Sequence, residues 1–399
     1  MALGPTKLGR IWIKQQAAWG TAITSFADTD SMDVQGTFMP AGLQEALSQP
    51  VVRPVFGASP KQGGSKAGGT IQMTWVQTNT TAAASHIEHQ LIADALGTLQ
   101  EQAGIGTIAG TSIATRLDVT TGDQDWIGQG ALVGLTGGGS QIGWVKDVDN
   151  TPTPDEVTIT SLLAVPNSAV TVLPTITIAF DANNTSGLPF TVQFAGKSNS
   201  GERLWDGRVS SLTGTFDAKG QITWQATLTF LNNVGVDSLT AAAFTFPRSQ
   251  LGPNLNALSV DLSDDSAFCY AGLSLSVTQT LAESPCNSSA QGVSQLVTAD
   301  RVVTLTERLL SEDVYADAYQ APGATGSFAW GLTSKTAATG YHAAIYGAGL
   351  QLASMSQPTD LGGLWGVERV WEAPATLNTG DTDDGASTVK LTRFRISFG

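Results

Sequence analysis

Alternation of apolar and small polar residues is the feature of this sequence that most restricts its fold. In Thr70–Val76 apolar side chains occupy every second position, and Phe190–Phe194 and Gln221–Leu231 repeat the pattern. Because successive side chains of a strand point to opposite faces of a sheet, a period of two predicts strands with one buried face. Thr and Val suit such half-buried strands, so we expect mainly β structure.

The chain is long and poor in charge. Its 399 residues exceed the roughly 250–300 residues at which a single core stops growing, so we expect two or more domains. Only 14% of residues are charged, compared with about 25% in typical soluble domains. With 20 Lys+Arg against 34 Asp+Glu, the net charge is −14. An acidic surface aids solubility, repels phosphate backbones, and would suit a channel wall that DNA passes without binding.

Targeting signals and cysteines indicate the compartment of synthesis. No run of about 18 apolar residues is present, so we expect no membrane-spanning helix. The first residues, Met1–Pro5, lack the charged and apolar regions of a signal peptide. Cys269 and Cys286 are too few to stabilise a chain of this size. We therefore expect free thiols and a reducing cytoplasm, with a disulfide across a hairpin as the alternative.

The first half divides by shifts in pattern. We expect residues 1–32 to form an N-terminal arm and residues 33–106 to begin a β domain, in which a glycine-rich loop, Pro50–Gly69, joins two strands. Ser85–Glu88 has the form of a capping box, and apolar residues then recur at helical spacing up to Gly97. These features predict a helix that packs by one apolar face on a sheet.

Residues 107–180 are expected to form a small inserted β domain, after which the first domain resumes over residues 181–245. Short strands separated by Gly- and Pro-rich turns predict a small barrel or sandwich. The five expected strands are Ala114–Val119, Ala131–Leu135, Gln141–Val148, Glu156–Ser161 and Thr175–Phe180.

The second half, residues 257–399, repeats the order of patterns in the first. A strand, the long loop Glu283–Asp300, a return strand and a helix at Ser311–Tyr319 follow one another, and a hairpin with Trp in its return strand closes each half. Repetition of this kind indicates an internal duplication. We therefore predict a mainly β protein of two tandem barrel or sandwich domains, each with one flanking helix, plus the insert.

Few residues are arranged for chemistry. His86 and His89 could share a metal from one helical face, but a zinc site needs at least a third ligand, so exposed helix residues are the better interpretation. The acidic turns Asp147–Asn150 and Asp381–Gly385 are best interpreted as solvated, because the second lacks the acidic twelfth residue of a calcium loop. Nucleophile-elbow and phosphate-loop motifs are absent. We predict no catalytic residue, no metal and no cofactor.

Gly9–Ile13 and Ala18–Thr21 open the chain, and Arg203–Phe230 is a Gly-led strand that turns back into a Thr-rich strand. These segments resemble the opening arm and the closing hairpin of the tail-tube proteins of long-tailed bacteriophages. The resemblance implies tail-tube-like β domains that each carry one helix and a long hairpin loop, with six domains in a ring and rings that stack. Because the usual subunit has one barrel, a chain with two would form the ring from three copies. The insert would then lie on the outside.

The resemblance also implies a role for the two long loops. Loops of about 15–20 residues without their own structure are uncommon unless they are functional. Here they would reach from ring to ring in a virion protein that is made in the host cytoplasm and conducts DNA. Its partners would be copies of itself, the tail tip and tail terminator proteins, and a tape measure protein and DNA that pass through the lumen. The candidate ring-to-ring residues are Gly57, Lys61, Gly64, Lys66, Gly69, Glu283, Asn287 and Gln291.

Two other classes of function remain open from the sequence. A phage or bacterial surface adhesin could bind carbohydrate through Trp126 and Trp144 of the insert, although Trp in a small barrel is more often part of the core. An adhesin need not polymerise, so tube formation would separate it from a tail-tube protein. A hydrolase would need paired carboxylates in a pocket, and no spacing in this sequence identifies such a pair.

Overall fold

A computed structural model describes twenty-one strands and one α-helix, and it confirms the mainly β fold predicted from the sequence. The described residues are 10–27, 30–32, 34, 44–53, 57–77, 86–102, 108, 110–119, 132–136, 141–149, 154–159, 165, 171–195, 201–217, 222–236, 269–285, 293–310, 323–333, 342–361, 364–375 and 393–398. The helix is α1 (Ile87–Leu96). No described helix is long and apolar enough to cross a membrane.

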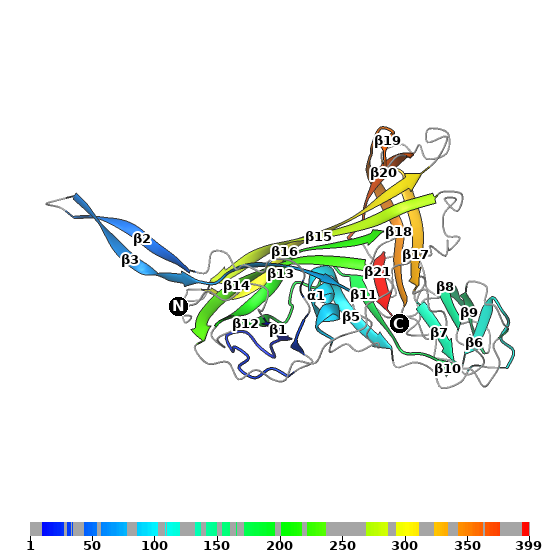
Figure 1. The fold of residues 1–399 in the computed structure, drawn as a ribbon, viewed down its shortest axis with the longest axis horizontal. Helices are drawn as coiled ribbons and strands as arrows, with labels where there is room; N and C mark the ends of the chain where they lie inside the picture. Colours follow the sequence, from blue (N-terminus) through cyan, green and yellow to red (C-terminus); the bar gives the residue numbers. More distant parts are fainter. Residues whose placement is uncertain are drawn as a thin grey trace.

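Fourteen strands form one large antiparallel sheet, which dominates Figure 1. They are β1 (Arg10–Gln15), β4 (Gly69–Val76), β5 (Gly97–Gln102), β11 (Thr175–Phe180), β12 (Phe190–Ala195), β13 (Gly201–Asp217), β14 (Ile222–Val236), β15 (Cys269–Pro285), β16 (Val293–Leu310), β17 (Thr325–Thr333), β18 (His342–Met355), β19 (Thr359–Asp360), β20 (Trp365–Glu372) and β21 (Phe394–Phe398). The main path runs β1-β12-β13-β15-β16-β20-β18-β21-β11-β5, with β14 and β4, β17, and β19 branching from β13, β18 and β20.

The predicted alternation places the main core on one face of this sheet. In β4, Ile71, Met73 and Trp75 are buried, while the residues between them are polar. Trp75 lies directly opposite Trp224 of β14. The side chains of α1 belong to the same cluster of buried residues, so the helix covers this face.

The two halves of the chain share one sheet. β13 of the first half pairs with β15 of the second, from Ser211 opposite Thr278 to Asp217 opposite Gly272. Neighbour order is the same in both halves: β12-β13-β14-β4 in the first and β17-β18-β20-β16 in the second. An internal duplication would produce this order. The predicted second helix, Ser311–Tyr319, lies outside the described residues.

Part of the predicted insert forms a separate five-stranded sheet, ordered β10-β7-β8-β9-β6. Its strands are β6 (Arg116–Val119), β7 (Leu132–Thr136), β8 (Gln141–Asp149), β9 (Asp155–Ile159) and β10 (Thr171–Val172), and they enclose their own apolar core. The fifth expected strand, Thr175–Phe180, lies instead in the large sheet between β21 and β5. Its pairing partners are distant in sequence, so local pattern could not place it.

Helix α1 confirms the spacing argument and corrects its details. The helix ends at Gly97, which has a φ of 130°. His86 takes the N-cap position without a side-chain cap, and Ser85 of the predicted capping box lies outside the described residues. Glu88 and Asp94 are buried together with the apolar residues. The prediction that α1 packs on a sheet by one apolar face was therefore incomplete, because strands surround the helix on several sides. The helix contacts β1, β5, β11, β13 and β15.

The described part of the predicted arm belongs to the sheet. β1 pairs with β12 along its whole length, and Trp12 and Ile13 are buried. Gln16 donates from Nε2 to the Asp206 carboxylate (3.0 Å) and accepts the Asp206 N–H (2.8 Å). The Gly20 N–H donates to the same carboxylate (2.8 Å). These bonds hold the chain after β1 against β13.

Candidate assembly site

A two-stranded ribbon is the most distinctive surface element. It is formed by β2 (Gln44–Arg53) and β3 (Gly57–Ala67), which pair from Gln44 opposite Ala67 to Arg53 opposite Gly57. Figure 1 shows the ribbon projecting away from the large sheet. Eleven residues in β3 span roughly 35 Å at the usual strand rise. The predicted loop Pro50–Gly69 is therefore mostly paired strand.

Gly68 marks the point where the ribbon enters the large sheet. Its φ is 137°, and a Cβ at this position would lie 2.3 Å from the Phe230 carbonyl oxygen. Only glycine fits such a backbone and such a close approach. The next residue, Gly69, begins β4 opposite Phe230.

The predicted loop of the second half is also mostly strand. β15 extends to Pro285 and β16 begins at Val293, so Glu283–Asp300 is largely a long antiparallel hairpin. Glu283 lies opposite Leu296 and is exposed. The prediction of an unstructured loop was wrong because backbone pairing holds a segment whose side-chain pattern is irregular.

The register places the ribbon and this hairpin at the same end of the sheet. β14 runs past Phe230, the partner of Gly69, to Val236, which faces Gly201 at the start of β13. β15 is antiparallel to β13 and runs on beyond Thr278 towards that same end. Of the predicted contact residues, Gly57, Lys61, Gly64 and Lys66 lie on β3, Gly69 at its base and Glu283 on β15. Asn287 and Gln291 lie outside the described residues.

A buried polar network closes a break in the sheet beside this end. On one edge of β13, β12 pairs up to Gly207 and β15 pairs from Ser211. Val209 lies in the break. Its N–H donates to Asp94 Oδ2 of α1 (2.8 Å), and its carbonyl accepts from Gln279 Nε2 (2.9 Å). Side chains thus satisfy backbone groups that no strand pairs there.

Asp94 and Arg208 form the centre of the network. Arg208 Nε donates to Asp94 Oδ1 at 2.6 Å, and the two side chains are 1% and 2% exposed. Burial raises the pKa of the Asp94 carboxyl, and Arg208 and the Val209 N–H oppose that shift. Arg208 also donates to Thr298, whose hydroxyl donates to Gln279 Oε1 (2.8 Å). The network therefore joins α1, β13, β15 and β16.

Arg301 adds a second cation from β16. Its Nη2 donates to Gln279 Oε1 at 3.0 Å, and Nη1 donates to the Asp181 carbonyl. Burial lowers the pKa of Arg301 to about 10. Gly187 covers the ion pair so closely that a Cβ there would lie 2.6 Å from Arg208 and Asp94. The chain between β11 and β12 is thereby held against the network.

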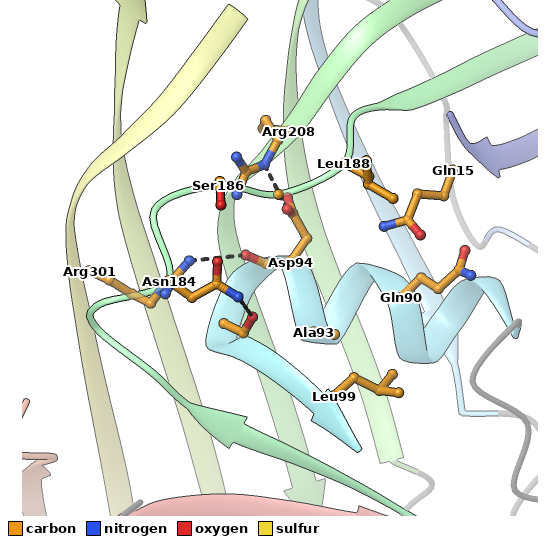
Figure 2. Close-up of a pocket in the computed structure, with 12 residues that line it drawn as sticks. Gln15, Gln90, Ala93, Asp94, Leu99, Asn184, Ser186, Leu188, Arg208 and Arg301 are labelled. Atoms are coloured by element: carbon orange, nitrogen blue, oxygen red, sulfur yellow. Dashed lines mark hydrogen bonds and ion pairs between the residues drawn. The ribbon is translucent and has the colours of Figure 1, made fainter. Parts of the chain in front are cut away.

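A cavity of about 450 Å³ adjoins this network, and Figure 2 shows the side chains around it. Arg208 and Asp94 face each other there, while Gln15, Gln90 and Leu188 lie on the opposite side. The lining mixes polar side chains with Ala93, Leu99 and Leu188, and its polar groups suit water molecules that bridge side chains. We interpret the network and the cavity as a structural junction that positions the hairpins.

The predicted histidine pair is brought together, but not as predicted. The rings of His86 and His89 are 5.5 Å apart, yet His89 is fully buried and stacks on Phe398 at 5.0 Å. The expectation of exposed residues was wrong for His89, because neighbouring strands enclose α1. Among the described residues, no group of three or more His, Cys, Asp or Glu could hold a metal.

The structure does not describe the side chains of several other residues that the sequence analysis named. Trp126, Cys286 and the turn Asp381–Gly385 fall outside the described residues. For Trp144 in β8 and Cys269 in β15 only the backbone is described. The prediction of free thiols therefore stays a prediction, and the alternative of a sugar-binding insert stays untested.

No family model matches the chain, and no curated protein matches it.

Sequence reasoning missed the four residues of the junction, Asp94, Arg208, Gln279 and Arg301. A usable signal was present in β15, where Leu273, Leu275 and Val277 point inwards and Gln279 takes the next inward position. Polar residues at inward positions need hydrogen-bond partners, so such a break in the pattern indicates a buried network.

Proposed function

We propose that this chain is a structural protein that polymerises with copies of itself into the tube of a long bacteriophage tail. The supporting observation is the projecting β2–β3 ribbon at the same end of the sheet as the β15–β16 hairpin. The ribbon strands pair with each other and with no other described strand. A two-stranded hairpin is marginal in water by itself. The surface of a neighbouring copy would stabilise the ribbon and explain its length.

The edges of the large sheet also favour self-assembly. β4 pairs with β14 alone, and β17 pairs with β18 alone, among the described strands. An open edge presents unpaired backbone groups and is a template for further strands. Closed rings of copies would cover such edges and remove the hazard of open-ended aggregation.

In this proposal three copies form a ring of six similar halves, and the rings stack through the ribbons. The insert extends outwards, where its bulk does not obstruct stacking. Tail tip and tail terminator proteins close the two ends of the tube, and a tape measure protein and DNA occupy the lumen. No catalytic residue is required. No described residue favours the adhesin alternative.

Electron microscopy of the purified chain tests the proposal, with a ribbon truncation as the decisive variant. Glu45 and Lys66 are direct cross-strand partners, so residues 46–65 can be replaced by an Asn-Gly turn without leaving an unpaired strand. We expect the wild type to form rings and tubes, and the truncated chain to form rings that do not stack. Circular dichroism should show both chains folded.

A charge variant tests the same proposal without depending on whether the truncated chain folds. Lys61→Glu with Lys66→Glu keeps the β3 backbone and reverses two charges on the ribbon, and Lys146→Glu reverses one charge on β8 of the insert. The ribbon variant should shorten the tubes, and the insert variant should not. A wild-type chain that stays monomeric at all concentrations, or truncated chains that form tubes of normal length, would contradict the proposal.

A further inference from the structure

One face of the central strands is lined by neutral hydroxyl and amide side chains. Cross-strand partners in antiparallel strands share a face, and the register aligns these residues in three rows across β4, β14, β13, β15 and β16. The rows are Val76–Thr223–Thr215–Ser274–Thr306, Thr74–Gln225–Thr213–Ser276–Thr304 and Gln72–Thr227–Ser211–Thr278–Val302. We call this surface the hydroxyl face. Val76 and Val302, at two of its ends, are its apolar members.

The hydroxyl face is opposite the core. The residues that alternate with it, such as Met73, Leu212 and Val277, are buried in the main cluster together with α1. Apart from the buried Val76, its own members are exposed or partly exposed, among them Gln72, Gln225 and Thr278. None of the residues in the three rows is ionisable, although the chain as a whole carries a net charge of −14. The charged side chains of the protein therefore lie outside these three rows.

The chemistry of this face excludes the common kinds of tight binding. The buried core of a protein–protein interface is rich in apolar and aromatic residues, and only Val76 and Val302 are apolar here. Binding of a nucleic-acid backbone needs Lys or Arg, and binding of its bases needs aromatic rings. A sheet of Thr, Ser and Gln instead keeps a hydrated surface with no strong partner.

The margins of the hydroxyl face would repel a polyanion. Thr304 is followed across the sheet by Glu372, which is exposed, and Asp300 is exposed beyond Val302 on β16. Arg308, the next outward residue on β16, is paired with Glu368 at 3.2 Å. The bordering charges are thus acidic or neutralised. DNA beside this face would meet neutral hydroxyls and carboxylates.

We propose that the hydroxyl face lines the bore of the tube and that its occupant is passing DNA, held off by water and by the absence of cations. This inference rests on the proposed function. It names the surface along which DNA would pass without adhering, and it assigns that property to a neutral hydroxyl surface with acidic margins.

Site-specific labelling of assembled tubes tests the inference. Cysteine is introduced by Thr278→Cys on the hydroxyl face or Thr115→Cys, an exposed threonine of the insert, in a chain carrying Cys269→Ser and Cys286→Ser. Each variant is treated, before and after assembly, with a small maleimide or with a maleimide attached to a dextran too large to enter the tube. Mass spectrometry measures the labelled fraction.

We expect both reagents to label both variants before assembly. In tubes, Thr278→Cys should lose labelling by the dextran reagent and keep labelling by the small one, whereas Thr115→Cys keeps both. Retained dextran labelling of Thr278→Cys in tubes would place the face outside and overturn the inference. Loss of both labels would make the face a subunit interface, which also overturns it. Failure of every chain to form rings or tubes would instead reject the proposed function.

Discussion

At the scale of single residues, buried ion pairs mark positions that fix the tertiary fold within each half of the chain. Glu307 Oε2 of β16 accepts hydrogen bonds from Arg369 (3.0 Å) and from Trp371 Nε1 (2.6 Å) on β20, and both charged side chains are 0% exposed. Asp94 and Arg208 form a comparable pair in the first half. Each pair joins distant parts of the sequence, so each specifies a tertiary contact that apolar packing alone would leave less defined.

Removing the cation of the buried Asp94–Arg208 pair should strongly destabilise the fold. In Arg208→Met the Asp94 carboxylate stays buried with its main counter-charge gone, and breaking a buried pair in this way costs about 3–5 kcal/mol. The free energy of unfolding in urea measures the effect. Arg308→Met is the matched control, because its pair with Glu368 is about 40% exposed and exposed pairs contribute about 0–1 kcal/mol. Equal losses in the two variants would disprove the role assigned to burial.

At the scale of elements, the entry point of the ribbon depends on backbone conformation. Gly68→Ala would force a side chain into a φ of 137° and against the Phe230 carbonyl, which should cost about 1–3 kcal/mol. Gly235→Ala is the control, since nothing lies within 4 Å of its Cβ position. Thermal unfolding of both variants checks the prediction. A destabilisation by Gly235→Ala as large as that by Gly68→Ala would show that φ and steric space are irrelevant at Gly68.

Elements with a regular side-chain period could be predicted from the sequence. Helix α1 and its end at Gly97 were found from 3.6-residue spacing, and β4 and β14 from alternation. The ribbon was predicted as a loop, because Gly57–Gly69 has no apolar period and its strands are held by backbone bonds. The junction of Asp94, Arg208 and Gln279 could not be predicted from the sequence, because only the tertiary fold brings these residues together.

At the scale of the whole molecule, pairing between β13 and β15 makes one sheet from two halves. The sequence predicted the repeated order of elements but not this shared edge, because strand pairing between distant segments leaves no local pattern. A single sheet that crosses both halves fixes their relative orientation. In the proposed ring, neighbouring copies would meet edge to edge, as the two halves of one chain do through β13 and β15.

The inserted sheet should be dispensable for this architecture. Gln102 of β5 and Thr175 of β11 are direct cross-strand partners, so the insert leaves and re-enters the large sheet at adjacent positions. Replacing residues 103–174 by an Asn-Gly turn would convert β5 and β11 into a plain hairpin, while the core of the insert, which is separate from the main core, is removed whole. We expect a folded chain that still forms tubes, with a smaller outer diameter and an unchanged bore by electron microscopy. A chain that unfolds would show that contacts of β7 with β11 and β18 are essential to the large sheet. A wider bore with an unchanged outer diameter would place the insert inside the tube.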